Sequence, residues 1–342
     1  MLEIDGSQGE GGGQVLRTAL ALSLVTRTPF RIVRLRAGRK KPGLRRQHLV
    51  AVEAAARVGA ARVEGAQEGS RGLVFEPGAV LAGTYELDIG TAGSTTLVLQ
   101  TIVPALLRAE GPSRIAVQGG THNPLAPPWE FLEHVWLPLV ARLGPRVSGR
   151  LVRHGFYPAG GGRVEVELEP AADLRPFELL ARGPVQAREA RAIVSALPVD
   201  VARRELAVVR ERLGWPAEAL QPIKVEDPRG PGNALVLRVG CAQAVEVVSA
   251  CGERGLPAEV VAERAVAELL RWHAADVPVG EHLCDQLLLL LALAGGGRFR
   301  TLAPLSGHAT TQMALIPRFL PGLRLASGPA GEGALEVRVE AA

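Results

Sequence analysis

Gly9-Glu-Gly-Gly-Gly-Gln14-Val-Leu-Arg-Thr-Ala-Leu-Ala-Leu-Ser-Leu24 is a glycine-rich loop that runs directly into an apolar helix pattern. The same arrangement returns at residues 90–107 and 280–297, and a short turn and a strand pattern follow each helix. Each unit then shows a second helix start, at residues 42–48, 123–129 and 306–311. Because self-similarity along a chain is the sequence signature of repeated structure, these segments predict three similar α+β units.

The third unit begins much further along the chain than the spacing of the first two predicts, which leaves room for an insertion. Proline-containing stretches, Gly183-Pro184 and Val277-Pro278, are typical of boundaries at both ends of this segment. The sequence therefore predicts a three-repeat catalytic domain, residues 1–182 and 278–342, with a smaller α/β domain at residues 183–277. Within the insertion we expect a first strand, then a helix at 200–213, strands at 221–225 and 234–239, and a helix at 258–274.

Composition excludes several function classes. The chain has 342 residues, a formal net charge of +4 and 39 basic residues, of which only Lys40, Lys41 and Lys224 are lysines. None of these lysines follows a glycine, so there is no Walker A loop, and none lies in the Lys-x-Asp-Gly motif of ordinary nucleic-acid ligases. The histidines form no His-Glu-x-x-His motif, and three scattered cysteines favour neither a disulfide framework nor a zinc site.

The sequence also bears on where the protein acts. The first residues show no basic-then-apolar pattern of a signal peptide. The longest apolar run, residues 287–294, is far too short to span a bilayer. We therefore expect a soluble cytoplasmic protein that does not associate with a membrane.

The first glycine loop is a candidate ligand site. Glycines let backbone approach a ligand closely, and the N–H groups at the start of a helix favour an anion. Glu10 is the one charged residue of the loop, and a carboxylate with phosphate oxygens can hold Mg²⁺. Gln14 and Arg17 lie on the first turns of the helix that follows. The alternative is a tight turn that only caps a core helix, and the residues alone leave both interpretations open.

A basic segment, residues 31–48, begins in the strand pattern that follows this helix. It has no acidic residue before Glu53, and the loop at residues 38–43 concentrates like charges near a helix start. Such a loop favours phosphate binding, whereas Arg31 and Arg34 also fit a solvated strand face. Since the segment lacks stacking aromatics, a polynucleotide end is a better expected ligand than a long single strand. The basic residues are Arg31, Arg34, Arg36, Arg39, Lys40, Lys41, Arg45 and Arg46.

Two histidines lie at predicted helix starts. His308 follows Ser306-Gly307, where a helix N-terminus disfavours imidazolium and favours phosphate, so its neutral ring would be available as a nucleophile. The alternative for His308 is an ordinary surface or core histidine. His282 precedes Asp285 and Gln286, which fit either a helix cap or contacts to a ribose or a base. His48 closes the basic segment as a phosphate contact or a plain helix residue.

Longer motifs resemble the RNA 3′-terminal phosphate cyclase family. The opening Asp5-Gly-Ser-Gln-Gly-Glu-Gly-Gly-Gly-Gln14 and the segments at 36–48, 93–100 and 123–128 are similar to family motifs. Arg153-His-Gly-Phe-Tyr-Pro-Ala-Gly-Gly-Gly162 closely resembles the family signature. The resemblance runs over nearly the whole chain and is weakest in the predicted insertion.

This resemblance implies a fold, an activity and partners. The fold is three repeats of a four-stranded sheet and two helices, each like the C-terminal domain of translation initiation factor 3, plus one inserted domain. The activity is ligase-type conversion of an RNA 3′-phosphate into a 2′,3′-cyclic phosphodiester, with ATP and Mg²⁺ or Mn²⁺ as cofactors. A histidine attacks the α-phosphate of ATP, AMP then passes to the RNA phosphate, and the 2′-hydroxyl displaces it. The expected partners are RNA 3′-phosphate ends, and we allow for a homodimer.

The resemblance also assigns residues by position. His308 matches the nucleophile and Glu10 the metal-linked glutamate. Phosphate or RNA-end contacts are expected at Arg17, Arg39, Gln47 and His48, and the adenylate pocket at Gln100, Pro127, Phe131, His282, Asp285 and Gln286. Two positions depart from the family pattern: Gln312 stands where asparagine is common, and His282 where tyrosine is common.

Two alternatives belong to other classes. A non-catalytic relative that acts in RNA processing or ribosome assembly would lack the nucleophilic histidine, which this chain has at His308. An enolpyruvyl transferase has a related repeat architecture but forms no covalent bond to AMP.

Overall fold

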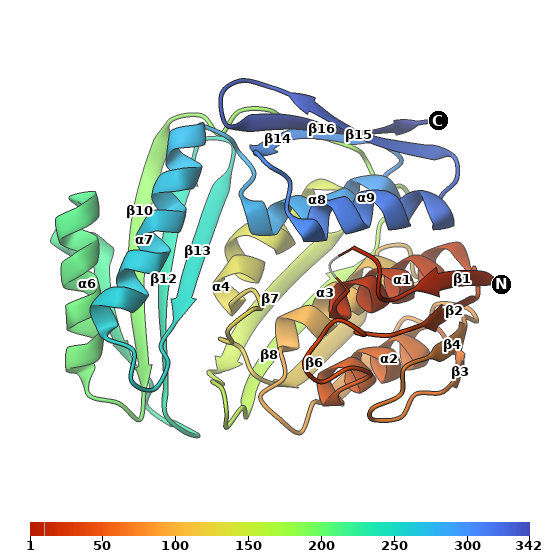
Figure 1. Cartoon of the computed structure of the whole chain (residues 1–342), viewed down its shortest axis with the longest axis horizontal. Helices are drawn as coiled ribbons and strands as arrows, with labels where there is room; N and C mark the ends of the chain where they lie inside the picture. The colour runs from red at the N-terminus through yellow and green to blue at the C-terminus, as the bar shows by residue number, and fades with distance from the viewer. Residues whose placement is uncertain (10) are drawn as a thin grey trace.

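A computed structural model describes residues 1–9 and 11–342, and these residues form four mixed, four-stranded sheets with helices packed against them (Figure 1). The strands are β1 Leu2–Asp5, β2 Phe30–Val33, β3 Arg62–Glu64, β4 Leu73–Glu76, β5 Thr84–Asp88, β6 Ser113–Gly119, β7 Arg146–Arg153, β8 Gly162–Glu169, β9 Glu178–Leu179, β10 Val185–Ser195, β11 Leu220–Lys224, β12 Gly232–Cys241, β13 Val245–Cys251, β14 Gly297–Leu302, β15 Leu323–Pro329 and β16 Ala334–Ala341. The α+β class predicted from the sequence is confirmed.

The helices lie between the strands along the chain. They are α1 Gly13–Thr26, α2 Arg46–Val58, α3 Thr95–Leu106, α4 Trp129–Phe131, the π-helical turn η1 Leu132–Trp136, α5 Leu137–Arg142, α6 Val199–Leu213, the 3₁₀ turn η2 Ala217–Ala219, α7 Ala258–Ala275, α8 Glu281–Leu293 and α9 Gly307–Phe319.

Three of the sheets have the same topology. Their strand orders are β1-β2-β4-β3, β5-β6-β8-β7 and β9-β14-β16-β15. In each, the first two strands in this order pair in parallel and the other neighbours pair antiparallel. A parallel pair needs a crossover, and α1, α3 and α8 fall within the three connections that supply it.

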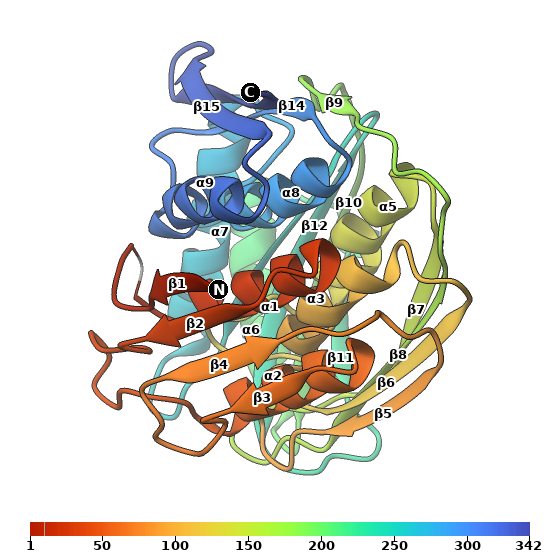
Figure 2. The same cartoon turned by 90° about the vertical axis from the view of Figure 1, so that its right-hand side faces the viewer.

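Helices fill the space that these three sheets enclose. Figure 2 shows α1, α3, α8 and α9 at the centre, with the sheets on the outside. Contacts of α1 with α3 and with α9 join the first unit to the second and the third, and α8 packs against α9 within the third. Because α1 and α8 pack on several sides, their sequences are apolar almost all round, as the buried runs at residues 18–22 and 287–293 show.

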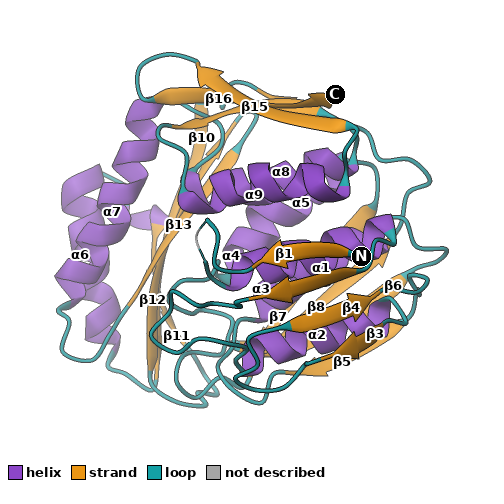
Figure 3. Ribbon diagram, turned by 45° about the vertical axis from the view of Figure 1, so that its right-hand side comes forward, coloured by secondary structure: helices purple, strands orange, loops and turns teal. Residues whose placement is uncertain are grey.

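Residues 185–275 form the fourth sheet with α6 and α7, hereafter the β10–β13 unit. In Figure 3, α6 and α7 cover one face of this sheet and the rest of the molecule lies against the other. Side chains alternate between the faces: Leu235 and Leu237 join the core under α6 and α7, whereas Ala234 and Val236 join the main core. The unit is therefore buried against the three-sheet body as well as within itself.

Most elements expected from the sequence are present. The insertion's predicted helices at 200–213 and 258–274 correspond to α6 and α7, and its two located strands to β11 and β12. The expectation missed β13, and the second helix of the middle unit is divided into α4, η1 and α5. The predicted domain boundaries at 183 and 277 stay a prediction.

The basic loop, residues 36–46, is fixed by close backbone contacts. Arg36 donates to the carbonyl oxygens of Lys41 and Gly43, at 2.9 and 2.8 Å. Gly43 has φ +79°, and a Cβ placed there would lie 2.3 Å from the carbonyl oxygen of Gly69. Only glycine fits this position, since a side chain meets both backbone strain and a steric clash.

Gly43→Ala should therefore destabilise the protein more than Gly69→Ala. Gly69 has φ +81°, but a Cβ there would have no neighbour within 4 Å among the described residues. We expect about 1 kcal/mol of backbone strain in both variants, and about 1–3 kcal/mol more for Gly43→Ala from overpacking. Urea unfolding measures both free energies, and equal losses would contradict the close approach at Gly43.

Candidate active site

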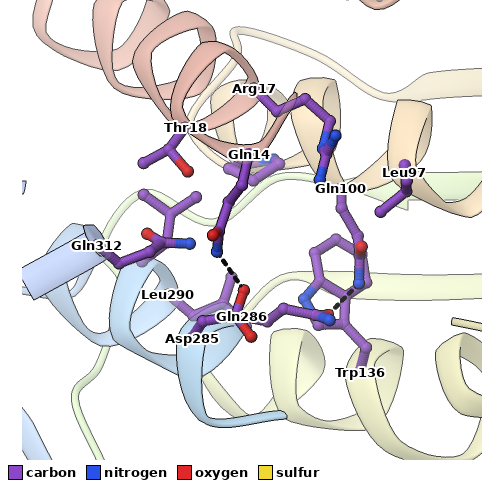
Figure 4. Close-up of a pocket in the computed structure, with 12 residues that line it drawn as sticks. Gln14, Arg17, Thr18, Leu97, Gln100, Trp136, Asp285, Gln286, Leu290 and Gln312 are labelled. Atoms are coloured by element: carbon purple, nitrogen blue, oxygen red, sulfur yellow. Dashed lines mark hydrogen bonds between the residues drawn. The ribbon is translucent and has the colours of Figure 1, made fainter. Parts of the chain in front are cut away.

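A cavity of about 60 Å³ lies where helices of all three units meet. Figure 4 shows polar side chains from α1, α3, α8 and α9 pointing into it, with Trp136 at one side. The helices α1, α3, η1, α8 and α9 supply its lining, which is Gln14, Arg17, Thr18, Leu97, Gln100, Pro104, Trp136, Asp285, Gln286, Leu289, Leu290 and Gln312. Residues far apart in the sequence thus share one polar cavity inside an apolar core.

Gln14 connects two other helices across this cavity. Its side-chain nitrogen donates to Asp285 Oδ2 on α8 at 2.5 Å (Figure 4). Its side-chain oxygen bonds to His308 Nδ1 at the start of α9. Gln14 is 5 % exposed, so water competes little for either bond. The amide therefore fixes His308 relative to Asp285.

This arrangement defines the form of the His308 ring. An amide oxygen only accepts hydrogen bonds, so Nδ1 must carry the proton that it donates to Gln14. In the neutral ring the lone pair then lies on Nε2. Partial burial, followed by the positive charges of Arg17 and Arg39, lowers the pKa of His308. His308 is exposed at the first turn of α9, after the N-cap residue Ser306, so Nε2 is accessible and unprotonated near neutral pH.

Asp285 and Arg17 form the charged part of the cavity. Burial raises the pKa of Asp285 to about 7, although His282 and Arg17 oppose the rise. Burial also lowers the pKa of Arg17 to about 10, and Asp285 opposes that change. Arg17 stays cationic at neutral pH, while Asp285 titrates close to it.

A smaller cavity adjoins the first and shares Arg17 and Leu97 with it. Gln47 and His48 of α2 line this second cavity. Burial, followed by the charges of Arg17 and Arg36, lowers the pKa of His48 to about 3, so its ring is neutral. A Cβ at Gly13 would lie 2.5 Å from His48 Nε2, so the glycine lets the ring approach α1. Arg17, Gln47 and His48 thus line one cavity, and their role as phosphate or RNA-end contacts stays a prediction.

The basic loop reaches the same region. The charge of Arg39 contributes to the low pKa of His308, which places this arginine within electrostatic range of the ring. Arg39, Lys40 and Lys41 are exposed. Arg39 therefore adds positive charge on the exposed side of the site.

The structure places the other predicted residues in three ways. Gln100 and Gln286 line the cavity and hydrogen-bond to each other. Phe131 is 2 % exposed in the core, and the carbonyl of Pro127 accepts a hydrogen bond from Thr96 at 2.8 Å. His282 is exposed at the start of α8 and pairs with Glu268. The binding roles of Pro127, Phe131 and His282 stay predictions, and Glu10 lies outside the described residues.

Sequence reasoning did not assign roles to several residues of the lining. Thr18 lies one residue after Arg17 and one turn after Gln14, so helical spacing could have placed it on the same face. Trp136 gave no such signal, because it enters through the π-helical turn η1, which shifts the helical register. Gln312 appeared only as a departure from the family pattern. It hydrogen-bonds Asp285, and its Oε1 has no hydrogen-bond partner among the described residues.

The carboxylates of the site bear on metal binding. Outside residue 10, no group of three or more His, Cys, Asp and Glu residues is placed to hold a metal ion. Mg²⁺ in phosphate chemistry is usually bound by one or two carboxylates together with the phosphates of the substrate. The described residues thus fit a metal that arrives with a phosphate substrate better than a dedicated protein cage.

A histidine with a lowered pKa, the half-buried Arg17 and the exposed Arg39 define the class of the site. They are the parts of a site that attacks a phosphate ester and neutralises its charge. The family model for RNA 3′-terminal phosphate cyclase matches residues 8–322. The chain belongs to the RNA 3′-terminal phosphate cyclase family.

Individual relatives are similar over most of their length. The RNA 3′-terminal phosphate cyclase of Ectopseudomonas mendocina is 51 % identical over 93 % of this chain and 92 % of its own. The cyclase of Ralstonia nicotianae is also 51 % identical, over 94 % and 92 %. That of Pseudomonas fluorescens is 48 % identical over 100 % of this chain and 98 % of its own.

Within the described part of the chain, no helix combines the length and apolar character needed to cross a bilayer.

Asp285→Asn should change how stability depends on pH. Its folded pKa of about 7 lies above the ordinary 3.8, so between about pH 4 and pH 7 the folded protein keeps a proton that the unfolded chain has lost. The stability from this carboxyl is therefore present below that window and lost as the pH rises through it. Asparagine does not titrate, so the stability of the variant relative to wild type should increase as the pH rises.

Urea unfolding at several pH values between about 4.5 and 7.5 measures the free energy of unfolding of both proteins across the pH window in which Asp285 titrates. Asp200→Asn, at an exposed position in the first turn of α6, is the matched control. A difference for Asp285→Asn that does not change with pH would contradict the buried, protonated carboxyl.

Proposed function

We propose that the protein is an ATP-dependent RNA 3′-terminal phosphate cyclase. It converts an RNA 3′-phosphate into a 2′,3′-cyclic phosphodiester and releases AMP and pyrophosphate. The observation that carries this proposal is the hydrogen bond between His308 Nδ1 and Gln14, which leaves Nε2 available as a nucleophile beside the cavity that Arg17 and Asp285 line. Membership of the cyclase family supports it.

The first step is adenylation of His308. Nε2 attacks the α-phosphorus of ATP, an N–P bond forms, and the bond to pyrophosphate breaks. The ring gains positive charge in this step while Nδ1 keeps its proton on Gln14. Asp285, hydrogen-bonded to the other end of the Gln14 amide, stabilises that charge. Arg17 compensates the negative charge of the phosphate.

Two displacements complete the reaction. An oxygen of the RNA 3′-phosphate attacks the phosphorus of the histidine–AMP, and the N–P bond breaks to give RNA(3′)pp(5′)A. The 2′-hydroxyl then attacks the terminal RNA phosphorus, and AMP leaves as the P–O bond breaks. The hydroxyl is already adjacent to the phosphorus, so this displacement is intramolecular and needs little further positioning by the protein. Arg39, with Gln47 and His48 of the second cavity, binds the RNA end.

The nucleotide and its metal occupy the first cavity and its mouth. Gln100, Asp285 and Gln286 bind the adenosine part, with Pro127, Phe131 and His282 as the further predicted contacts. Mg²⁺ or Mn²⁺ neutralises phosphate charge when bound, and Glu10 is assigned to it from the family pattern alone.

The fold proposal is three repeats, each like the C-terminal domain of translation initiation factor 3. The shared strand orders of three sheets support it. The β10–β13 unit follows β9 and precedes α8, which supports an insertion into the third repeat at residues 183–277. The cytoplasmic location and the homodimer stay predictions from the sequence.

The alternative functions predict different chemistry. A non-catalytic RNA-processing or ribosome-assembly factor has no use for a histidine held with Nε2 unprotonated. An enolpyruvyl transferase forms no covalent bond to AMP. The described site fits neither as well, because His308 is both oriented and accessible.

His308→Ala should abolish labelling of the protein by AMP. Intact mass after incubation with ATP and Mg²⁺ should show one acid-labile AMP adduct on wild type and none on the variant, because a phosphoramidate hydrolyses in acid. His273→Ala, an exposed histidine on α7, should keep the adduct. No adduct on nucleotide-free wild type, even with Mn²⁺, would favour the non-catalytic alternative, and an adduct on His308→Ala would move the nucleophile elsewhere.

Arg39→Ala should weaken cyclisation of RNA more than adenylation of the protein. Its charge lowers the pKa of His308, so the comparison is best made at alkaline pH, where the ring is neutral in both proteins. There we expect near-normal adenylation and a loss of about tenfold or more in use of a 3′-phosphate RNA, as for one removed charge-assisted phosphate contact. Arg31→Ala, an exposed arginine on β2, is the control. Equal losses in both steps would remove Arg39 from the RNA end.

A further inference from the structure

The β10–β13 unit contacts the first turn of α8 at three points. Glu268 on α7 pairs with His282 Nε2 at 3.1 Å, and Arg271 on the same helix pairs with Glu281. Glu246 on β13 accepts a hydrogen bond from the backbone N–H of Gly280, the N-cap residue of α8, at 3.2 Å. All three contacts come from outside the three-sheet body and reach the helix that carries Asp285 and Gln286.

The Glu246 contact is tightly packed. Glu246 is 2 % exposed, and a Cβ at Gly280 would lie 2.2 Å from its Oε1. As a glycine, the N-cap residue Gly280 has no side chain that could accept hydrogen bonds from the free N–H groups of the first turn. The Glu246 carboxyl accepts the hydrogen bond of the Gly280 backbone N–H instead. The position at which α8 begins is therefore set from the β10–β13 unit.

The Glu268 contact holds a ring beside the nucleotide cavity. His282 lies three residues before Asp285, so the two share one face of α8. Asp285 and Gln286 line the cavity and bind Gln14 and Gln100. A change in the orientation of this turn would alter the cavity and the hydrogen bonds that cross it.

We propose that Glu268 is a positioning residue for the nucleotide site: its ion pair with His282 lets the β10–β13 unit hold a cation at the start of α8 and thereby tune His308. This inference rests on the proposed function, since it assumes that His308 is adenylated. It gives the β10–β13 unit a role in catalysis, although the unit supplies no residue to the lining of the cavity described above.

The charges around His282 support this role. The hydrogen bond that His282 Nε2 donates to Glu268 raises the pKa of His282 to about 9, helped by the charges of Glu268 and Glu281 and opposed by burial. Burial raises the pKa of Glu246 to about 8, so this carboxyl is mostly neutral at neutral pH and adds little to the effect. His282 is therefore an imidazolium at neutral pH. Two other charged groups lie near this turn. Asp285 on α8 has a pKa that burial raises and that the charge of His282 lowers. Arg271 on α7 pairs with Glu281 at 2.6 Å.

The His282 cation acts on the nucleophile through space. Its charge is one of the causes of the low pKa of His308, together with burial and the charges of Arg17 and Arg39, while Glu281 opposes them. Loss of the Glu268 carboxylate would lower the pKa of His282 and neutralise its ring. The pKa of His308 would then rise, so a higher pH would be needed to free Nε2.

The test compares Glu268→Gln with Glu259→Gln in the whole protein. Glu259 is on the same helix but pairs with Arg204 of α6, away from the site, at 2.6 Å. Single-turnover adenylation is followed by intact mass at several MgATP concentrations. The pH is varied from about 5 to 9, which covers the titration of both histidines. Glu268→Asp tests rescue, because it restores the carboxylate.

We expect the acid limb of the pH–rate profile of Glu268→Gln to move upward by about half a pH unit, the size of effect of one nearby charge. The KM for ATP should rise about threefold, because the first turn of α8 loses one of its three contacts with the β10–β13 unit, an effect near that of one exposed ion pair. Glu259→Gln should match wild type, and Glu268→Asp should recover part of the shift.

A cycle with His282→Gln shows whether the effect passes through that ring. Glu268→Gln should add nothing further in the His282→Gln background, and additive effects would overturn the proposal. An unshifted profile for Glu268→Gln would also overturn it while leaving the cyclase intact. If Glu268→Gln does not fold, the exposed His282→Gln variant must show the same upward shift on its own. A wild-type protein that forms no adduct would overturn the proposed function, and this inference with it.

Discussion

The Gln14 amide is the interaction on which the site depends. One end donates to Asp285 on α8 and the other accepts from His308 on α9, while Gln14 itself belongs to α1. Two helices near the end of the chain are thus held by a single side chain from the first helix, which lies 271 residues before Asp285 and 294 before His308. The three-sheet body makes this possible, because it places the helices on the inside, where a short amide can reach both partners.

Burial explains how the same groups acquire different charges. Arg17 stays cationic, Asp285 is held near its titration point, and His48 is kept neutral, all within one connected polar region. In each case removal from water is the main cause of the altered pKa, and the neighbouring charges adjust it. The fold therefore sets the protonation state of each group before any ligand enters.

Much of the fold could be predicted because glycine loops and apolar helices recur in the chain, and the helix at 200–213 was found from its own pattern. The strand β13 was missed although Val245-Glu-Val-Val is rich in β-branched residues, because the stretch is buried on both faces and shows no clear alternation. Within the site, Arg17, Gln47 and His48 could be grouped from sequence motifs. Trp136 could not, since a π-helical turn changes the register that helical spacing assumes.

The hydrogen bond between Gln100 and Gln286 has a consequence for ligand selection. The cavity it crosses is about 60 Å³, whereas pockets for small molecules are typically about 300–1,000 Å³. A base that enters between α3 and α8 must separate the two amides and then satisfy a donor and an acceptor that had satisfied each other. A flat ring without such an edge would leave the Gln100 donor and the Gln286 acceptor without each other's hydrogen bond. Under the proposed function, the cavity would therefore select its ligand by exchange, because it favours a molecule that can replace the hydrogen bond that it breaks.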